Sequence, residues 1–150
     1  SFGKLISTND TIKNNLKTWL NEYRMINDTI DILDTKILNF GIDFTVRVKL
    51  DFNKFDVLQK CVDSLKQHFS EMYSIGERLE ISSVFTKLNT IEGVLDTTSV
   101  RIVNKTGGIY SNIAFDMENN TDPTGSFVLC PKNCIFELKY PDLDVKGKIR

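Results

Sequence analysis

The chain offers few residues that could carry metal or thiol chemistry. It has one histidine, His68, and three cysteines, Cys61, Cys130 and Cys134. Cys130 and Cys134 are spaced as C-x3-C, which falls within the range of half a zinc site. Cys61 and His68 stand about 10 Å apart along their predicted helix, so the four ligands would not converge readily. We therefore expect no metal, no other cofactor, and three free thiols in a reducing compartment.

His68 is also the only imidazole available as a catalytic base. A catalytic device would need it in a cleft beside a serine or cysteine nucleophile. The sequence places it at the border of a helix's apolar stripe, near the C-terminal end, where the helix dipole favours a charged imidazole. We predict a surface histidine and no catalytic residue. A small enzyme or ligand-binding module with a site near His68 is the alternative.

Carboxylate pairs are plentiful, but none lies in an apolar segment that would raise a pKa for acid catalysis. Another acidic group brackets a turn without the spacing of a calcium loop. The pairs are Asp28 and Asp31, Glu77 and Glu80, and Asp142 and Asp144, and the turn group is Asp116, Glu118 and Asp122.

A glycine-rich turn, Thr106–Gly107–Gly108, follows a predicted strand. It lacks the Gly-Lys-Ser/Thr of a phosphate loop and leads into another apparent strand, so it predicts a hairpin turn. The Gly107–Gly108 loop is the second place where the alternative ligand-binding module would have its site.

Composition and charge exclude several classes of function. Hydrophobic residues make up 41% of the 150 residues and charged residues 26%, which is typical of a globular chain. The formal net charge is −1, whereas nucleic-acid binding usually needs a basic face. No apolar run approaches the roughly 20 residues of a membrane span. We expect a soluble domain that binds no nucleic acid, membrane or small-molecule substrate.

The ends of the chain suggest that it is part of a longer protein. It begins at Ser1 with no signal-peptide pattern, and it ends at Arg150 directly after a predicted strand. We expect a fragment whose parent chain holds further residues.

Residues 8–23 predict an amphipathic helix that would begin after Thr8, Asn9 and Asp10, which are capping residues. We expect its apolar stripe, Trp19 included, to pack into the core. The stripe consists of Ile12, Leu16, Trp19, Leu20 and Tyr23.

Two strands are predicted next. Residues 29–38 predict a strand with a turn near Asp34–Thr35. Residues 40–50 alternate apolar and polar side chains, which predicts a strand with one face on the core and one in water. The inward residues are Ile42, Phe44, Val46, Val48 and Leu50.

Two further helices are predicted over 54–70, capped by Asn53, and over 83–91, capped by Ser82 or Ser83. Gly93 would end the second of them in a left-handed conformation. The stripes are Phe55, Leu58, Cys61, Val62, Leu65 and Phe69 in the first, and Val84, Phe85, Leu88 and Ile91 in the second.

The rest of the chain predicts strands separated by turns. These strands cover residues 98–104, a stretch containing Ile109, Ile113, Phe115 and Met117, residues 126–130 and 134–140, and an edge strand at Val145–Ile149. The fold class is therefore α+β: a strand-helix-helix-strand sandwich, preceded by an amphipathic helix and followed by an all-β C-terminal tail. Residues 1–104 would form the α+β domain, and residues 105–150 a β-rich subdomain or an extension of the same sheet.

Three stretches taken together resemble a known family. They are FGIDFTVRVKLDFNKFDVLQKCVDSLKQHF, IGERLEISSVFTKLNTIEGVLDTTSVRIVNKTGG and CPKNCIFELKYPDLDVKGKI, approached by YRMINDTIDI. Their shared order is a strand, a helix, Ile75–Gly76, a helix ending at Ile91–Glu92–Gly93–Val94, and a strand. Over most of residues 20–150 the chain resembles the C-terminal region of the baseplate wedge proteins of T-even-like contractile phages, which are related to the baseplate J-like family.

The resemblance implies structural work in a virion. Such proteins form homodimers, bind other wedge subunits and link wedges into a ring, and they offer no catalytic residues to transfer. It implies a tail baseplate location after assembly in the host cytoplasm. The apolar side chains of the predicted tail agree, because they exceed what one small sheet face needs, and we expect part of the tail to pair with another chain. Those side chains are Phe115, Phe127, Val128, Phe136 and Tyr140.

Overall fold

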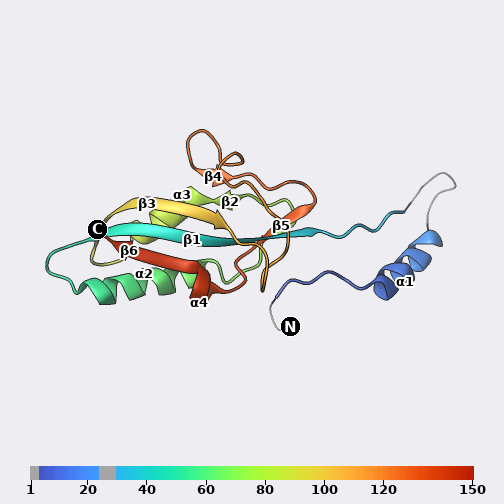
Figure 1. The fold of residues 1–150 in the computed structure, drawn as a ribbon, viewed down its shortest axis with the longest axis horizontal. Helices are drawn as coiled ribbons and strands as arrows, with labels where there is room; N and C mark the ends of the chain where they lie inside the picture. Colours follow the sequence, from blue (N-terminus) through green and yellow to red (C-terminus); the bar gives the residue numbers. More distant parts are fainter. Residues whose placement is uncertain (1–3, 24–29) are drawn as a thin grey trace.

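A long central strand organises the computed structural model, which describes residues 4–23 and 30–150 (Figure 1). In this part of the chain β1 (Lys36–Val48) lies in a four-stranded mixed sheet. β3 (Val94–Asn104) pairs with it in the antiparallel direction. On its other side β5 (Cys134–Glu137) and β6 (Val145–Ile149) pair with it in parallel, one after the other. The α+β class is therefore confirmed.

The alternation in β1 produces the two-sided sheet that the sequence predicted. Ile42, Phe44 and Val46 are buried, whereas Asp43 and Arg47 are exposed. The prediction for residues 40–50 overshoots at one end, because β1 ends at Val48 and the Leu50 side chain is fully exposed.

The strand predicted over residues 29–38 is wrong over residues 30–35, which form no regular structure. Lys36–Asn39 belong instead to the beginning of β1, where they pair with β5. The apparent alternation at Ile30 and Ile32 has no neighbouring strand to pair with in the described chain. Alternation alone therefore did not create a strand here, because strands need hydrogen-bonding partners.

Helix α2 (Lys54–His68) covers the buried face of the sheet and lies against β6. Asn53 caps it as predicted, since its Oδ1 accepts from the N–H groups of Phe55 (2.9 Å) and Asp56 (3.4 Å). Val57, Cys61 and Leu65 are its buried residues. Phe55, predicted to face inward, is 79% exposed, because it lies two residues before Val57 and so on another side of the helix.

Helix α3 (Ile81–Asn89) packs against β3 and begins earlier than the predicted serine caps. The N–H groups of Ile81 and Ser82 donate to the carbonyl oxygen of Ser126 (2.8 and 3.0 Å). This backbone contact takes the place of a side-chain cap. It belongs to a small pairing of β2 (Leu79–Glu80) with β4 (Phe127–Val128), which is far away in sequence. Gly93 has a positive φ (95°), as predicted, but it does not end the helix, because α3 ends at Asn89 with Thr90 as a right-handed C-cap.

The all-β tail predicted after residue 104 is not confirmed. The stretch from Ile109 to Met117 forms no strand, and the short helix α4 (Pro141–Asp144) stands between β5 and β6. The apolar side chains of this region pack on the chain's own core: Phe136 and Val128 are fully buried, and Phe115 contacts Phe136 with ring centroids 5.8 Å apart. Ile109, Leu129 and Leu143 of the same region are 54–56% exposed, and the pairing of this region with another chain stays a prediction.

The core lies between the sheet and helices α2 and α3. At one end Phe40 contacts the rings of Phe69, Tyr73 and Phe136 edge-on, with centroids 5.8–6.2 Å apart. The opposite sheet face carries the exposed side chains of Lys146 and Lys148 and the ion pair of Arg47 with Asp96. Among the described helices, none is long and apolar enough to cross a membrane.

Replacing Gly147 by alanine should destabilise the fold. An added Cβ would meet the Phe44 ring and lie 2.6 Å from Leu58 Cδ1, so β6 and α2 would have to separate. We expect Gly147→Ala to lower the free energy of unfolding by about 1–3 kcal/mol. Urea denaturation measures the change. Lys148→Ala, on the exposed face of the same strand, is the control and should change the free energy little.

Candidate functional site

Helix α1 (Asp10–Asn21) stands on an arm that extends away from the sheet and its helices (Figure 1). The helix lies within the predicted range 8–23, and Asn9 caps it through an Oδ1 that accepts from the Ile12 N–H (2.9 Å). Residues 4–9 lead out to the helix, and residues 30–35 lead back to β1. In the described chain, α1 has no buried residue.

The apolar stripe of α1 faces solvent instead of the core, so the prediction that Trp19 is a core residue is wrong for this chain. Trp19 is 56% exposed and Tyr23 71%, and their rings lie 5.0 Å apart. Ile12 and Leu16 are 54% and 45% exposed. The spacing of these residues, 4-3-4, matches the narrow apolar seam by which one helix packs on another.

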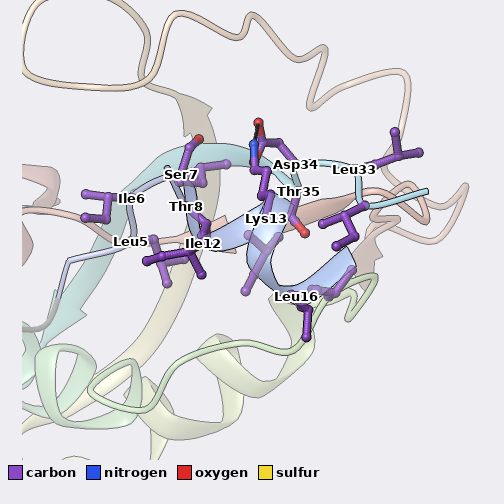
Figure 2. Close-up of a pocket in the computed structure, with 14 residues that line it drawn as sticks. Leu5, Ile6, Ser7, Thr8, Ile12, Lys13, Leu16, Leu33, Asp34 and Thr35 are labelled. Atoms are coloured by element: carbon purple, nitrogen blue, oxygen red, sulfur yellow. Dashed lines mark hydrogen bonds and ion pairs between the residues drawn. The ribbon is translucent and has the colours of Figure 1, made fainter. Parts of the chain in front are cut away.

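A groove of about 380 Å³ separates α1 from the end of the sheet (Figure 2). Its walls come from the outgoing arm, α1, residues 32–35 and the core's edge, and most of the lining side chains are aliphatic. Those aliphatic side chains are Leu5, Ile6, Ile12, Leu16, Ile32, Leu33, Ile37, Ile75 and Ile135. Ile6, Leu33 and Ile75 are each at least 60% exposed. We call this groove with the α1 stripe the arm surface.

One ion pair closes the arm on itself. Lys13 Nζ lies 2.7 Å from Asp34 Oδ2 and 3.8 Å from Asp10 Oδ1. It thereby joins α1 to the returning segment, beside the groove. An exposed ion pair of this kind contributes little to stability, so we expect it to influence the orientation of α1 more than the free energy of unfolding.

The arm surface is energetically unusual for a chain on its own. A helix of about 12 residues is marginal in water unless an apolar face packs on something. Large exposed apolar patches with polar rims mark sites of protein interaction. The geometry therefore fits a surface that receives a protein partner, and sequence reasoning missed it because the same stripe also predicts a core helix.

The structure places His68 at the end of α2, on the surface, beside α3. Its Nε2 lies 3.3 Å from Ser83 Oγ, a juxtaposition that the sequence did not predict. The Ser83 hydroxyl donates to the Glu80 carbonyl oxygen (2.8 Å), so its proton is already engaged. Among the hydrogen bonds of the described residues, no carboxylate orients the ring, and the pair lacks the third member of a serine–histidine device.

The three cysteines do not converge. Cys61 is buried on α2, and its burial raises the thiol pKa to about 11. The Cys130 thiol donates to the Cys134 carbonyl oxygen (3.3 Å), and burial also raises the pKa of Cys130. Within residues 4–23 and 30–150, no group of three His, Cys, Asp or Glu side chains could hold a metal ion.

The predicted carboxylate pairs do not converge on one site in the described residues, and Asp28 lies outside those residues. Glu77 accepts from the Ser74 N–H (2.6 Å), and Glu80 pairs with Arg78 (2.5 Å). Asp142 pairs with Lys66 (2.6 Å). Asp31 is exposed, and the turn carboxylates hold their own turns, Asp116 through Asn119 and Asp122 through Ser126. Glu118 lies 3.5 Å from Arg101.

Asp144 is the exception, because its side chain is buried, which no pattern in the sequence indicated. Its Oδ1 accepts from the Tyr110 hydroxyl (2.6 Å), and Lys105 Nζ lies 3.9 Å away. Burial, followed by this carboxylate, raises the pKa of Tyr110 to about 12. The contact joins the loop after β3 to α4.

The Gly107–Gly108 loop forms a turn, as predicted, but no second strand follows it. Both glycines have positive φ (75° and 59°), and the Tyr110 N–H closes the turn on the Gly107 carbonyl oxygen (3.0 Å). An added Cβ at either glycine would meet nothing within 4 Å. The loop therefore shows no cradle around a ligand.

No family model matches the chain, and no curated protein matches it either. The resemblance to baseplate wedge proteins therefore stays a prediction.

His68 should titrate below its ordinary pKa of 6.5, because burial and then the charge of Lys87 disfavour the imidazolium. The unfolded chain then binds the proton first, so the free energy of unfolding should fall as the pH drops below about 6.5. Following the ring resonances by NMR gives the midpoint directly, since the chain has one histidine. Lys87→Gln should raise the titration midpoint of His68, and Lys60→Gln, the control, should not. A wild-type midpoint at or above 6.5 would contradict the predicted lowering of the His68 pKa.

Proposed function

We propose that this chain is a non-enzymatic structural component of the baseplate wedge of a contractile phage tail. It would act by binding a second copy of itself and other wedge subunits, and so contribute to ring assembly in the virion. The observation that carries the proposal is the arm surface: an amphipathic helix on an extended arm with its apolar stripe exposed.

The chemistry of the described residues supports an interaction role more than a catalytic one. Several exposed apolar side chains gather on the arm, with Ile12, Leu16 and Trp19 on α1 and Ile6 and Leu33 on the segments before and after it. The groups that could react, in contrast, are separated or already engaged in local hydrogen bonds. His68 and Ser83 form the nearest approach to a reactive pair, and Ser83 donates to backbone. Transfer of apolar area out of water is the main favourable term in protein association, and the arm surface offers that area.

The arm alone would make a small interface. A helix of about 12 residues is roughly 18 Å long. A stable interface usually buries more than about 1,000 Å² in total, so a partner would have to engage the groove lining as well as the α1 stripe. The exposed aliphatic side chains of Ile6 and Ile75, on the groove rim, extend the apolar area in that direction.

The resemblance supplies the biological setting of the proposal. Homodimer formation, contact with other wedge subunits, a tail baseplate location and assembly in the host cytoplasm follow from the likeness to baseplate wedge proteins. The arm surface supports the part of this proposal that concerns protein–protein contact.

A charge placed on the apolar stripe should weaken self-association. Leu16→Asp puts a carboxylate in the centre of the stripe, where docking would remove it from water at high cost. We expect the apparent dissociation constant of the dimer to rise at least about tenfold, as measured by light scattering over micromolar concentrations.

The matched control is Asn14→Asp, which adds the same charge on the opposite side of α1 and should leave association unchanged. A wild-type chain that is monomeric throughout the micromolar range would count against homodimer formation through this surface. Equal effects of the two substitutions would show that net charge, and not the stripe, governs association.

A further inference from the structure

We infer that a buried polar chain, formed by Asn39, Glu137 and the backbone of Leu5 and Ser111, sets the position of the arm and couples it to the loop after β3. We call it the polar latch. The inference concerns regulation of the arm surface and rests on the proposed function for its biological meaning, although the latch itself can be tested without it.

Glu137 is the end of the latch that holds the arm. It is the last residue of β5, and it is 9% exposed. Its Oε2 accepts from the Leu5 N–H (2.6 Å), and its Oε1 accepts from Asn39 Nδ2 (2.9 Å). A carboxylate that is almost fully buried needs such donors. An oxygen atom without a hydrogen bond would lose its hydration without compensation, which is energetically costly.

Asn39 is the centre of the latch. It lies in β1, is 1% exposed, and uses both ends of its side-chain amide. Nδ2 donates to Glu137, and Oδ1 accepts from the Ser111 N–H (2.8 Å). Its backbone carbonyl oxygen accepts from the N–H of Lys105 (2.9 Å). One residue of the central strand therefore binds the loop on one side and the arm's carboxylate on the other.

The loop end is fastened at further points. The Ser111 hydroxyl donates to the Ile37 carbonyl oxygen (2.6 Å), and the Tyr110 hydroxyl donates to Asp144 (2.6 Å). The loop from Lys105 to Ser111 is thus tied to β1 and α4 by directional bonds. A change in the loop would reach Asn39 without passing through the apolar core.

The arm is held at its root mainly by polar contacts. Besides the bond from Leu5, the Lys4 ammonium donates to the Lys139 carbonyl oxygen and lies 4.4 Å from the centre of the Tyr140 ring. The next residue, Ile6, is 73% exposed, and α1 has no buried residue. Directional bonds at the root can therefore fix the direction of the arm, and their loss would free it while the core stays packed.

Two substitutions break the hydrogen bond between Leu5 and Glu137, one at its acceptor and one at its donor. Glu137→Gln keeps the size of the side chain, but an amide that still accepts from Asn39 turns its own N–H₂ toward the Leu5 N–H. Leu5→Pro removes the N–H donor and leaves Glu137 and Asn39 intact. Tyr110→Phe loosens the loop and tests the coupling, because it removes a hydrogen bond at the loop but none that Leu5 makes. Thr97→Val is the control, because it removes the hydrogen bond to Asn89 Oδ1, which involves no residue of the latch or the loop.

The readouts follow the arm directly. Amide exchange measured by NMR reports the Leu5 N–H, and time-resolved anisotropy of Trp19, the chain's one tryptophan, reports motion of α1. All variants are made in the full chain and also in the Leu16→Asp background, where the arm surface is impaired. The result is then independent of self-association, which light scattering measures separately.

We expect Glu137→Gln to speed exchange of the Leu5 amide roughly tenfold, and both latch variants to raise the amplitude of fast Trp19 motion, while amides of β1 and β3 stay protected. Tyr110→Phe should also speed exchange of the Leu5 amide, though less than Glu137→Gln, and Thr97→Val should leave Leu5 and Trp19 unchanged. Unchanged exchange and anisotropy in the latch variants would overturn the inference. Loss of protection across β1 and β3 as well would also overturn it, because Glu137 would then support the whole fold instead of the arm.

Discussion

The structure depends on hydrogen-bonded pairing of β1 along both of its edges. This strand is long enough to pair with β3 along one edge and with β5 and then β6 along the other, so every strand of the main sheet touches it. Its inward side chains, from Phe40 to Val46, form the middle of the core beneath α2 and α3. The parallel strands β5 and β6 are too short to be stable by themselves. They are stabilised because β1 provides their hydrogen-bonding partners and apolar side chains to pack beside.

The same strand lies between a part of the molecule whose apolar side chains form the core and an arm whose apolar side chains are exposed. The apolar side chains that β1 places inward from Phe40 to Val46 are buried, whereas before Lys36 the chain runs out along the arm, where Ile6, Trp19 and Leu33 stay exposed. The transition takes place at Asn39 and Glu137, which are buried but polar. A boundary made of directional hydrogen bonds favours one arm orientation, which an apolar contact of similar size would specify less sharply.

The reactive side chains take part in local structure. Glu80 pairs with Arg78 while its carbonyl oxygen accepts from Ser83, and Cys130 donates to the backbone of Cys134. These side chains use their hydrogen-bond donors and acceptors to stabilise turns and helix ends. The apolar side chains of the arm remain in contact with water, so burying them against another protein would be favourable. For this reason the proposed function is one of contact between proteins.

The sequence by itself determined the local elements. Alternation from Phe40 to Val48, the Asn53 cap, the left-handed Gly93 and the stripe of α1 each follow from the residues nearby, since periodicity and capping act over a few positions. It could not decide which partner each apolar face would meet. Trp19 and Leu65 lie on similar stripes, and only the tertiary structure buries one and exposes the other. The burial of Asp144, the approach of Ser83 to His68 and the link from Leu5 to Glu137 likewise join segments far apart in the chain. Such contacts depend on how β1 gathers its neighbours, and no local pattern contains that information.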